Sequence, residues 1–230
     1  MPPSQFATRF FVLVFAFAAL VGGRDTRAQD VRIEVGTGWV VPTKSVKADG
    51  TIKSGQMEGA TGVVPVDLNS GAHVYASAGL SWTVSSNFTL YTGLRAQQSQ
   101  LRVGEVGLRD CRRGNCSLSP DPDGQLWIAA LEGRITLTSV GRINPYFLVS
   151  LGVARTTVDG TRVETSRGGA IQLADVGVTD AGGDVGFGAS TSLVGDLSVN
   201  AEVRATGSLP GSKENAITTF PFSVGLSYRF

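Results

Sequence analysis

The last eleven residues, 220–230, alternate strictly between apolar and small or polar side chains. The apolar residues occupy every second position: Phe220, Phe222, Val224, Leu226, Tyr228 and Phe230. Because successive side chains of a strand point to opposite faces, this segment predicts a strand with one apolar face. The last residues of a soluble domain usually fray into water, so a terminal Phe230 indicates an apolar face that meets lipid. We therefore predict the closing strand of a membrane β-barrel, with Tyr228 and Phe230 in its aromatic girdle.

The same two-residue period recurs in about seven further segments. They span residues 31–41, 73–84, 88–97, 127–137, 146–154, 184–193 and 197–206. At about 3.3 Å per residue and a tilt near 45°, about eleven residues cover the ~25 Å apolar band of such barrels. Single-chain bacterial barrels have an even number of strands, and this pattern gives about eight. The predicted fold class is all-β, an antiparallel up-and-down transmembrane β-barrel.

Long and short connections alternate along the chain. The long ones are residues 42–71, 98–124, 156–181 and 207–215, and the short ones are residues 85–87, 138–143 and 195–196. Every second connection of an up-and-down barrel lies at the same end, so the long ones gather on one side, as the external loops of outer-membrane barrels do. Residues 62–68 leave open a count of ten strands, although Pro65 would interrupt their hydrogen bonding.

The first 28 residues are typical of a cleavable secretory signal peptide. Arg9 precedes an unbroken apolar run from Phe10 to Val21, and small residues flank a cleavage site before Gln29. The run holds about a dozen residues, whereas a spanning helix needs about 20. We expect residues 1–28 to be removed and residues 29–230 to form one β-barrel domain. An exported membrane protein without a spanning helix is expected to cross the membrane as a barrel.

Several of these segments resemble a known family. The residues that carry the resemblance are the closing sequence FPFSVGLSYRF, Asn144-Pro145-Tyr146, Gly152, Gly186-Phe187-Gly188 and Gln29-Asp30. They are similar to the small outer-membrane β-barrel proteins of Gram-negative-type bacteria, the OmpA-like transmembrane barrel group. The resemblance implies a place in the bacterial outer membrane, with outer-membrane lipid as a partner. It also implies that the assembly machinery of that membrane recognises an insertion signal: Phe222, Val224, Leu226, Tyr228 and Phe230.

Charge is nearly balanced over the chain, with 20 Lys and Arg against 19 Asp and Glu, which argues against nucleic acid as a partner. Strand phase places a set of ionisable residues on the inner face of the barrel: Arg32, Glu34, Arg95, Glu132, Arg134, Asp184, Glu202 and Arg204, with Arg229 in the same phase. Buried ions must pair, and an eight-stranded barrel is only just wide enough for its own side chains. We interpret five of them as a packed ionic plug, with Tyr75 and Tyr91 as hydrogen-bonding filler; the five are Glu34, Glu132, Arg134, Glu202 and Arg204. A gated ion path through switching Arg and Glu pairs is the alternative.

Other candidate chemistry is sparse. His73, the only histidine, belongs to the inner face, whereas a Ser–His pair acting on lipid would face the membrane. We therefore favour a lumenal polar or loop-anchoring role for His73. Cys111 and Cys116 are expected to form a disulfide in an oxidising compartment, with a free redox pair as the alternative. Two thiols without further ligands cannot complete a tetrahedral site, and we expect no metal and no cofactor.

Long loops on a rigid barrel are the remaining functional surface. Their local basic cluster, Arg109, Arg112 and Arg113, either contacts lipid phosphates or is a solvated loop tip. We expect a non-enzymatic outer-membrane protein that acts structurally or through surface interactions of these loops, around a polar, plugged lumen. A small-solute or ion channel is the first alternative, and a lipid-modifying outer-membrane enzyme is the second. The competing fold is a soluble lipocalin-like barrel, whose apolar residues would point inward around a ligand.

Overall fold

The computed structural model describes residues 30–43, 45–54, 59–106, 116–119, 123–138, 142–165, 169–208 and 217–230. Nearly all of these residues belong to strands of one antiparallel sheet. In these ranges, no helix is long and apolar enough to cross a membrane. The predicted signal peptide and the basic cluster at Arg109, Arg112 and Arg113 lie outside the described residues, and so both stay predictions.

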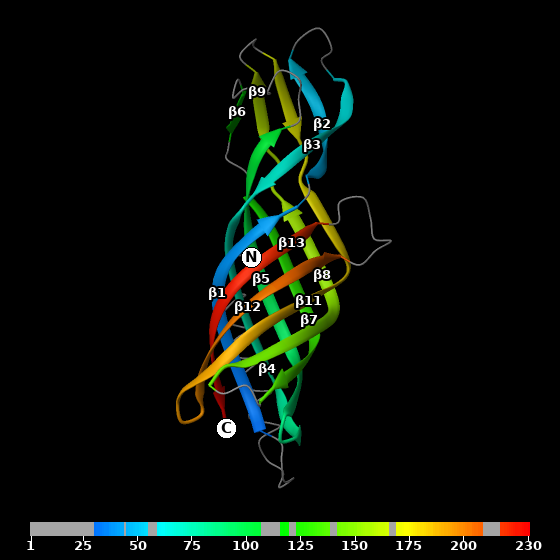
Figure 1. Ribbon diagram of the computed structural model, residues 1–230. Helices are drawn as coiled ribbons and strands as arrows, with labels where there is room; N and C mark the ends of the chain where they lie inside the picture. The colour runs from blue at the N-terminus through cyan, green and yellow to red at the C-terminus, as the bar shows by residue number, and fades with distance from the viewer. Residues whose placement is uncertain are drawn as a thin grey trace.

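Among the described residues, eight strands close into a barrel (Figure 1). The ring consists of β1 (Asp30–Pro42), β4 (Gly71–Ser85), β5 (Phe88–Val106), β7 (Asp123–Leu137), β8 (Asn144–Val158), β11 (Val176–Val194), β12 (Leu197–Ser208) and β13 (Thr218–Arg229). Each ring strand pairs with the next one along the chain, and β13 returns to pair with β1. The predicted all-β, antiparallel, up-and-down barrel is confirmed.

The two ends of the barrel differ. The tight β4–β5 and β11–β12 turns lie at the same end as the C-terminus, which we call the turn end (Figure 1). There the backbone N–H of Phe230 donates a hydrogen bond to the carbonyl of Val31 at 2.9 Å. The longer connections leave the opposite end, which we call the loop end. This separation follows from the alternation of short and long connections in the sequence.

Five further strands extend the sheet beyond the loop end. They are β2 (Val46–Ser54), β3 (Thr61–Asn69), β6 (Cys116–Ser119), β9 (Arg162–Thr165) and β10 (Ala170–Leu173). β3 joins them to the ring where Leu68 lies opposite Val103 of β5, and the order then runs β2, β10, β9 and β6. We call these five strands the outer sheet, and they occupy the upper part of Figure 1.

The prediction that these five segments are loops was wrong. The sheet has thirteen strands in the described residues, and a count of eight applies to the ring alone. Residues 62–68 do form a strand, but it belongs to the outer sheet instead of the ring. These segments form strands because they pack at the loop end of the barrel, where Val46 and Val64 are buried. A short alternation in the sequence does not reveal such packing.

The ring has an apolar exterior. On β13, exposed and buried positions alternate, and the exposed ones include Phe222, Val224 and Leu226. Large apolar side chains are exposed on the other ring strands too, among them Leu131 of β7 and Phe187 of β11. Water does not favour such a continuous apolar belt, whereas lipid does. An apolar outside around a polar inside does not fit a soluble lipocalin-like barrel.

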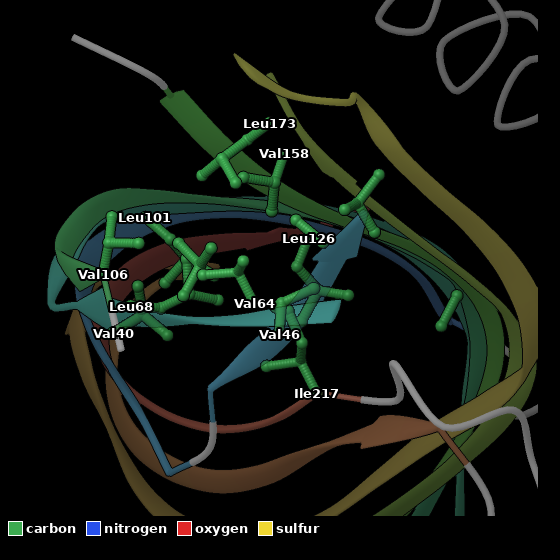
Figure 2. Packing of buried hydrophobic residues seen from close by; sticks show 14 of the residues in the cluster. Val40, Val46, Val64, Leu68, Leu101, Val106, Leu126, Val158, Leu173 and Ile217 are labelled. Atoms are coloured by element: carbon green, nitrogen blue, oxygen red, sulfur yellow. The ribbon is translucent and has the colours of Figure 1, made fainter. Parts of the chain in front are cut away.

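The interior changes character along the barrel axis. Near the loop end, the inward side chains become apolar, and Leu101 and Leu126 pack with Val46 and Val64 of the outer sheet and with Ile217 (Figure 2). Each buried Val or Leu contributes roughly 1.5–3 kcal/mol relative to exposure. The expected polar lumen therefore applies only to the section between this apolar core and the turn end. The apolar core lies at the loop end of the barrel.

Candidate functional site

The buried charges of the lumen come from five strands. Arg32 and Glu34 lie on β1, Arg95 on β5, Glu132 and Arg134 on β7, Asp184 on β11, and Glu202 and Arg204 on β12. Three of these strands carry an Arg and a Glu two residues apart, a spacing that puts both side chains on the same face. All eight side chains point inward, and only Arg32 is appreciably exposed, near the turn end.

Glu132 lies between three arginines. Its Oε1 accepts from Nη2 of Arg134 at 2.9 Å, and its Oε2 accepts from Nη2 of Arg204 at 2.8 Å. Nη1 of Arg95 lies 3.6 Å from Oε2 of Glu132. Because all four side chains are buried, water does not weaken these interactions.

Glu202 is a second centre of the network. Its Oε1 accepts from Nη2 of Arg95 at 2.6 Å and from Nε of Arg204 at 2.9 Å. The hydroxyl of Tyr146 donates to its Oε2 at 3.2 Å, and the hydroxyl of Ser223 donates to Oε1 at 3.3 Å. Both carboxylate oxygens are thus satisfied by donors from four different strands.

Asp184 completes the contacts of Arg204. Nη1 of Arg204 donates to Oδ1 of Asp184 at 2.5 Å, while Nε2 of Gln97 donates to Oδ2 at 3.3 Å. The guanidinium of Arg204 therefore binds Asp184, Glu132 and Glu202 together. Such multidentate contacts hold a planar guanidinium in one orientation.

Glu34 links the network to β1 and β4. Its Oε2 accepts from Nη1 of Arg134 at 2.9 Å and from Nη2 of Arg32 at 3.1 Å. The hydroxyl of Tyr75 donates to Oε1 at 2.9 Å, and Nδ2 of Asn200 donates to the same oxygen. The eight charged residues therefore form one connected cluster, which we call the lumenal network.

Aromatic rings pack against two of the arginines, Arg95 and Arg134. The guanidinium carbon of Arg95 lies 3.7 Å from the ring centroid of Tyr75. The guanidinium carbon of Arg134 lies 4.3 Å from the ring centroid of Tyr146 and 5.3 Å from that of Tyr91. These cation–π contacts add attraction where the arginines have lost water.

The lumenal network is balanced in charge and densely hydrogen-bonded. It joins four arginines to three glutamates and one aspartate. Burying a single ion costs several kcal/mol, and pairing together with additional hydrogen bonds offsets that cost. Among the described residues, no group of three or more His, Cys, Asp or Glu is arranged to hold a metal ion. The arrangement is suited to filling space and fixing strands in place.

Structural comparisons place this chain beside solved outer-membrane proteins. Neisserial surface protein A is 13% identical to this chain. The match covers 88% of this chain and 97% of the Neisserial chain, with a TM-score of 0.45. OprG from Pseudomonas aeruginosa is 16% identical, with 88% and 96% covered and a TM-score of 0.47. The outer-membrane protease OmpT from Escherichia coli is 10% identical, with 90% and 99% covered and a TM-score of 0.49. No protein-family model and no curated protein matches the sequence.

Likeness at these identities and scores assigns no function. OmpT is named as a protease, and that activity belongs to OmpT alone. The resemblance to the OmpA-like group therefore stays an expectation of the sequence. The fold itself follows from the strand pairing of this chain.

His73 lies on the inner face of β4, fully buried. Its Nδ1 lies 3.0 Å from the hydroxyl oxygen of Ser99, and its Nε2 has no hydrogen-bond partner in the described part of the chain. Ser99 is buried as well. The pair therefore has no route to lipid on the outer face, and its position suits a polar packing role.

The other sequence-predicted residues fall in three places. The five proposed insertion-signal residues point outward from the last strand, and the rings of Tyr228 and Phe230 meet edge to face at 4.8 Å. Arg229, expected in the lumen, is half-exposed at the turn end, where its Nη1 lies 3.6 Å from Oδ2 of Asp30. Cys111 and the side chain of Cys116 lie outside the described residues, so the disulfide stays a prediction.

Sequence reasoning missed several neutral partners of the lumenal network, namely Gln97, Tyr146, Asn200 and Ser223. All four share the inward phase of the charged residues on their strands. Neutral polar residues at inward positions beside paired charges were the signal that would have found them. Which carboxylate each one meets depends on the pairing of distant strands.

Proposed function

We propose that this chain is an integral protein of the bacterial outer membrane, with a lumen closed to solutes and a structural or surface-interaction role. The apolar belt of the ring supports lipid as its surroundings. The long connections on one side support an outward-facing loop end. The outer sheet presents Lys53, Val63 and Asp67 to solvent, a mixed surface suited to contacts with other molecules.

The observation that supports this proposal is that two differently packed sections follow one another along the lumen. The lumenal network fills the section nearer the turn end with buried, mutually bonded side chains. The apolar core packs Leu101, Leu126 and Val46 together at the loop end. An ion crossing the barrel would have to disrupt both, and each disruption costs several kcal/mol.

Conductance in planar bilayers tests whether the lumen is closed. Refolded protein is expected to show no channel events above the bilayer baseline. The Glu132→Gln variant is expected to be silent as well, because the apolar core still occupies the loop end of the lumen. Discrete openings in the unmodified protein that become larger in Glu132→Gln would favour the ion-channel alternative instead.

A non-enzymatic role is part of the proposal. The Ser–His pair formed by Ser99 and His73 is buried on the inner face, away from lipid substrates. A lipase or protease activity of the purified protein that disappears in His73→Ala would contradict this part. We also propose that the assembly machinery recognises the apolar face of β13, because that face is continuous to Phe230.

A further inference from the structure

A cavity of about 310 Å³ opens on the outer surface of the barrel at its loop end, over β1, β4, β5 and β7. Its lining combines one aromatic ring with polar and charged side chains, namely Trp39, Gln100, Arg102, Asp123 and Gln125. The outward positions of β5 are apolar at Leu94 and Ala96 and become polar from Gln98 towards the loop end, so the cavity lies beyond the apolar belt. Volumes of about 300–1,000 Å³ are typical of small-molecule sites. A small ligand can therefore enter from water.

Small residues at the start of β4 form the floor of the cavity. Gly71 and Ala72 both line it, and Ala72 lies opposite Trp39 of β1 in the strand pairing. A Cβ on Gly71 would collide with the backbone carbonyl oxygen of Gln100, so this position has to stay without a side chain. The longer side chains of β1 and β5 therefore lie on either side of a low floor.

Two pairs of polar residues on β5 and β7 form the wall. Gln100 lies opposite Gln125, and Arg102 lies opposite Asp123. Within the described ranges, the side chains of Gln100, Arg102 and Asp123 make no hydrogen bond or ion pair with other protein groups. Their donors and acceptors are therefore available to a ligand.

Gln125 is held in place by its neighbours. Its Oε1 accepts hydrogen bonds from Nε2 of Gln98 at 3.4 Å and from Nε1 of Trp127 at 3.3 Å. Because the carbonyl end of this amide is engaged, its nitrogen remains as a donor. The wall thus has an oriented donor beside the exposed Gln100.

The wall carries donors and acceptors in balance. The Arg102 guanidinium only donates hydrogen bonds, the Asp123 carboxylate only accepts them, and the Gln100 amide does both. Since the charges of Arg102 and Asp123 oppose each other, neither an anion nor a cation gains net attraction from the pair. A sugar hydroxyl both donates and accepts, and so a neutral sugar can use every group of the wall.

Trp39 supplies the apolar side of the cavity. Its side chain is 51% exposed, and β4 separates it from the polar wall. An aromatic residue at this height is usual in a membrane barrel, but a polar wall across a narrow floor from it is a separate feature. A pyranose ring has a face of C–H groups that packs on an indole, with hydroxyls around its edge. The two sides of the cavity match these two parts of the ring.

We propose that this cavity binds a neutral pyranose sugar from the aqueous phase, with the C–H face of the sugar against Trp39 and its hydroxyls bonded to the wall. The proposal rests on the surface-interaction role proposed above and gives that role a ligand class. The cavity is built by ring strands, so the site is present in any folded barrel.

Saturation-transfer-difference NMR of the refolded barrel tests the site. The protein is kept in micelles of a detergent without a sugar head group and titrated with the methyl glycosides of glucose, galactose and mannose. At least one of the three is expected to receive saturation, most strongly at the protons of its C–H face. No transfer to any of them, from a barrel that shows heat-modifiable gel mobility, would overturn the proposal and leave the membrane placement standing.

Trp39→Ala and Trp82→Ala are matched variants. Trp82 has the same outward phase on β4 but lies near the turn end, outside the lining. Trp39→Ala should weaken binding about tenfold, because it removes one packed aromatic face. Trp82→Ala should leave the affinity unchanged. An affinity that survives Trp39→Ala, or equal losses in the two variants, would contradict the site.

Asp123→Asn tests the balance of charge in the wall. It keeps the shape of the side chain but leaves Arg102 without an opposite charge. The affinity for the neutral glycoside should fall about fivefold, the difference between hydrogen bonds to a charged and to a neutral acceptor. The matching uronate, which carries a carboxylate, should bind this variant more tightly than the unmodified protein. A uronate that binds the unmodified protein more tightly than the neutral glycoside would contradict a neutral ligand.

Discussion

Glu132 is the residue on which the charge balance of the lumen depends most. Arg95, Arg134 and Arg204 all lie within ion-pair distance of its carboxylate, and none of these groups has access to bulk water. Removing one member of a buried ion pair typically costs about 3–5 kcal/mol, because the remaining charge stays buried without compensation. Exposed ion pairs contribute far less.

The Glu132→Gln variant is therefore expected to lower the free energy of unfolding by about 3–5 kcal/mol. Reversible urea unfolding in lipid vesicles, followed by heat-modifiable gel mobility, measures this change. Glu164→Gln is the matched control, because Glu164 pairs with Arg162 at 3.0 Å but both side chains are more than half exposed. We expect the control to change stability by less than about 1 kcal/mol. Equal losses in the two variants would contradict a tightly coupled network.

Gly36 and Gly225 make room for the Tyr75 ring that supports Glu34. The two glycines lie opposite each other on β1 and β13. A Cβ on Gly36 would lie 2.4 Å from Cε1 of Tyr75, and one on Gly225 would lie 2.3 Å from the Tyr75 hydroxyl. The Tyr75 ring can lie directly over both strands because neither glycine carries a side chain.

Gly36→Ala is expected to displace Tyr75 and to reduce stability by about 1–3 kcal/mol, the usual cost of an overpacked site. The same unfolding measurement applies. Gly133→Ala is the control, because a Cβ on Gly133 meets nothing within 4 Å. A Gly36→Ala protein as stable as Gly133→Ala would show that Tyr75 does not depend on this space.

At the scale of elements, β13 has two roles. It closes the ring against β1 and presents an apolar face that runs to Phe230. In the folded barrel, the side chain of Phe230 is 68% exposed at the turn end, so burial within the protein does not explain an aromatic residue there. Recognition during assembly is a separate requirement, and it can be separated from stability by experiment.

Phe230→Ser is expected to reduce the fraction of heat-modifiable protein in cell membranes several-fold, because assembly is impaired. The same variant refolded in vitro should retain nearly the stability of the unmodified protein. Val194→Ser provides the control, since Val194 is an exposed apolar residue at the turn end of a different strand. Loss of assembly in both variants alike would point to general hydrophobicity instead of a C-terminal signal.

Two-residue alternation predicted each ring strand because one face of each strand is apolar and the other polar. It underestimated their lengths: β5 and β11 each have 19 residues and continue past the belt into the loop end. There the inward side chains become apolar, as at Leu101, and the exterior becomes polar, so the pattern of the belt inverts. Segments that pack on the mouth, such as β2 and β3, are defined by tertiary contacts that no local pattern specifies.

The lumenal network could also be predicted only in part. Strand phase alone placed Glu132 and Arg204 on the inner face. It did not show that they meet at 2.8 Å, because that contact depends on how β7 and β12 are brought together by ring closure. The sequence therefore predicted which residues face the lumen, whereas the barrel geometry determined which of them pair with one another.

For the whole molecule, three regions follow one another along a single axis. The apolar belt surrounds the lumenal network, the apolar core lies above it at the loop end, and the outer sheet extends beyond that end (Figures 1 and 2). This order is the one expected if, as proposed, the outer sheet projects into water on one side of a membrane and the tight turns project on the other side. Val63 of the outer sheet and Ser86 of the β4–β5 turn are both exposed and mark the two sides.

Cysteine labelling in intact cells tests this arrangement most directly. Val63→Cys and Ser86→Cys are each made in a Cys111→Ser, Cys116→Ser background and treated with a membrane-impermeant maleimide. We expect Val63→Cys to react in intact cells, and Ser86→Cys to react only after the outer membrane is permeabilised. Labelling of Ser86→Cys in intact cells, or protection of Val63→Cys until permeabilisation, would contradict a barrel that spans the outer membrane with its outer sheet facing outward.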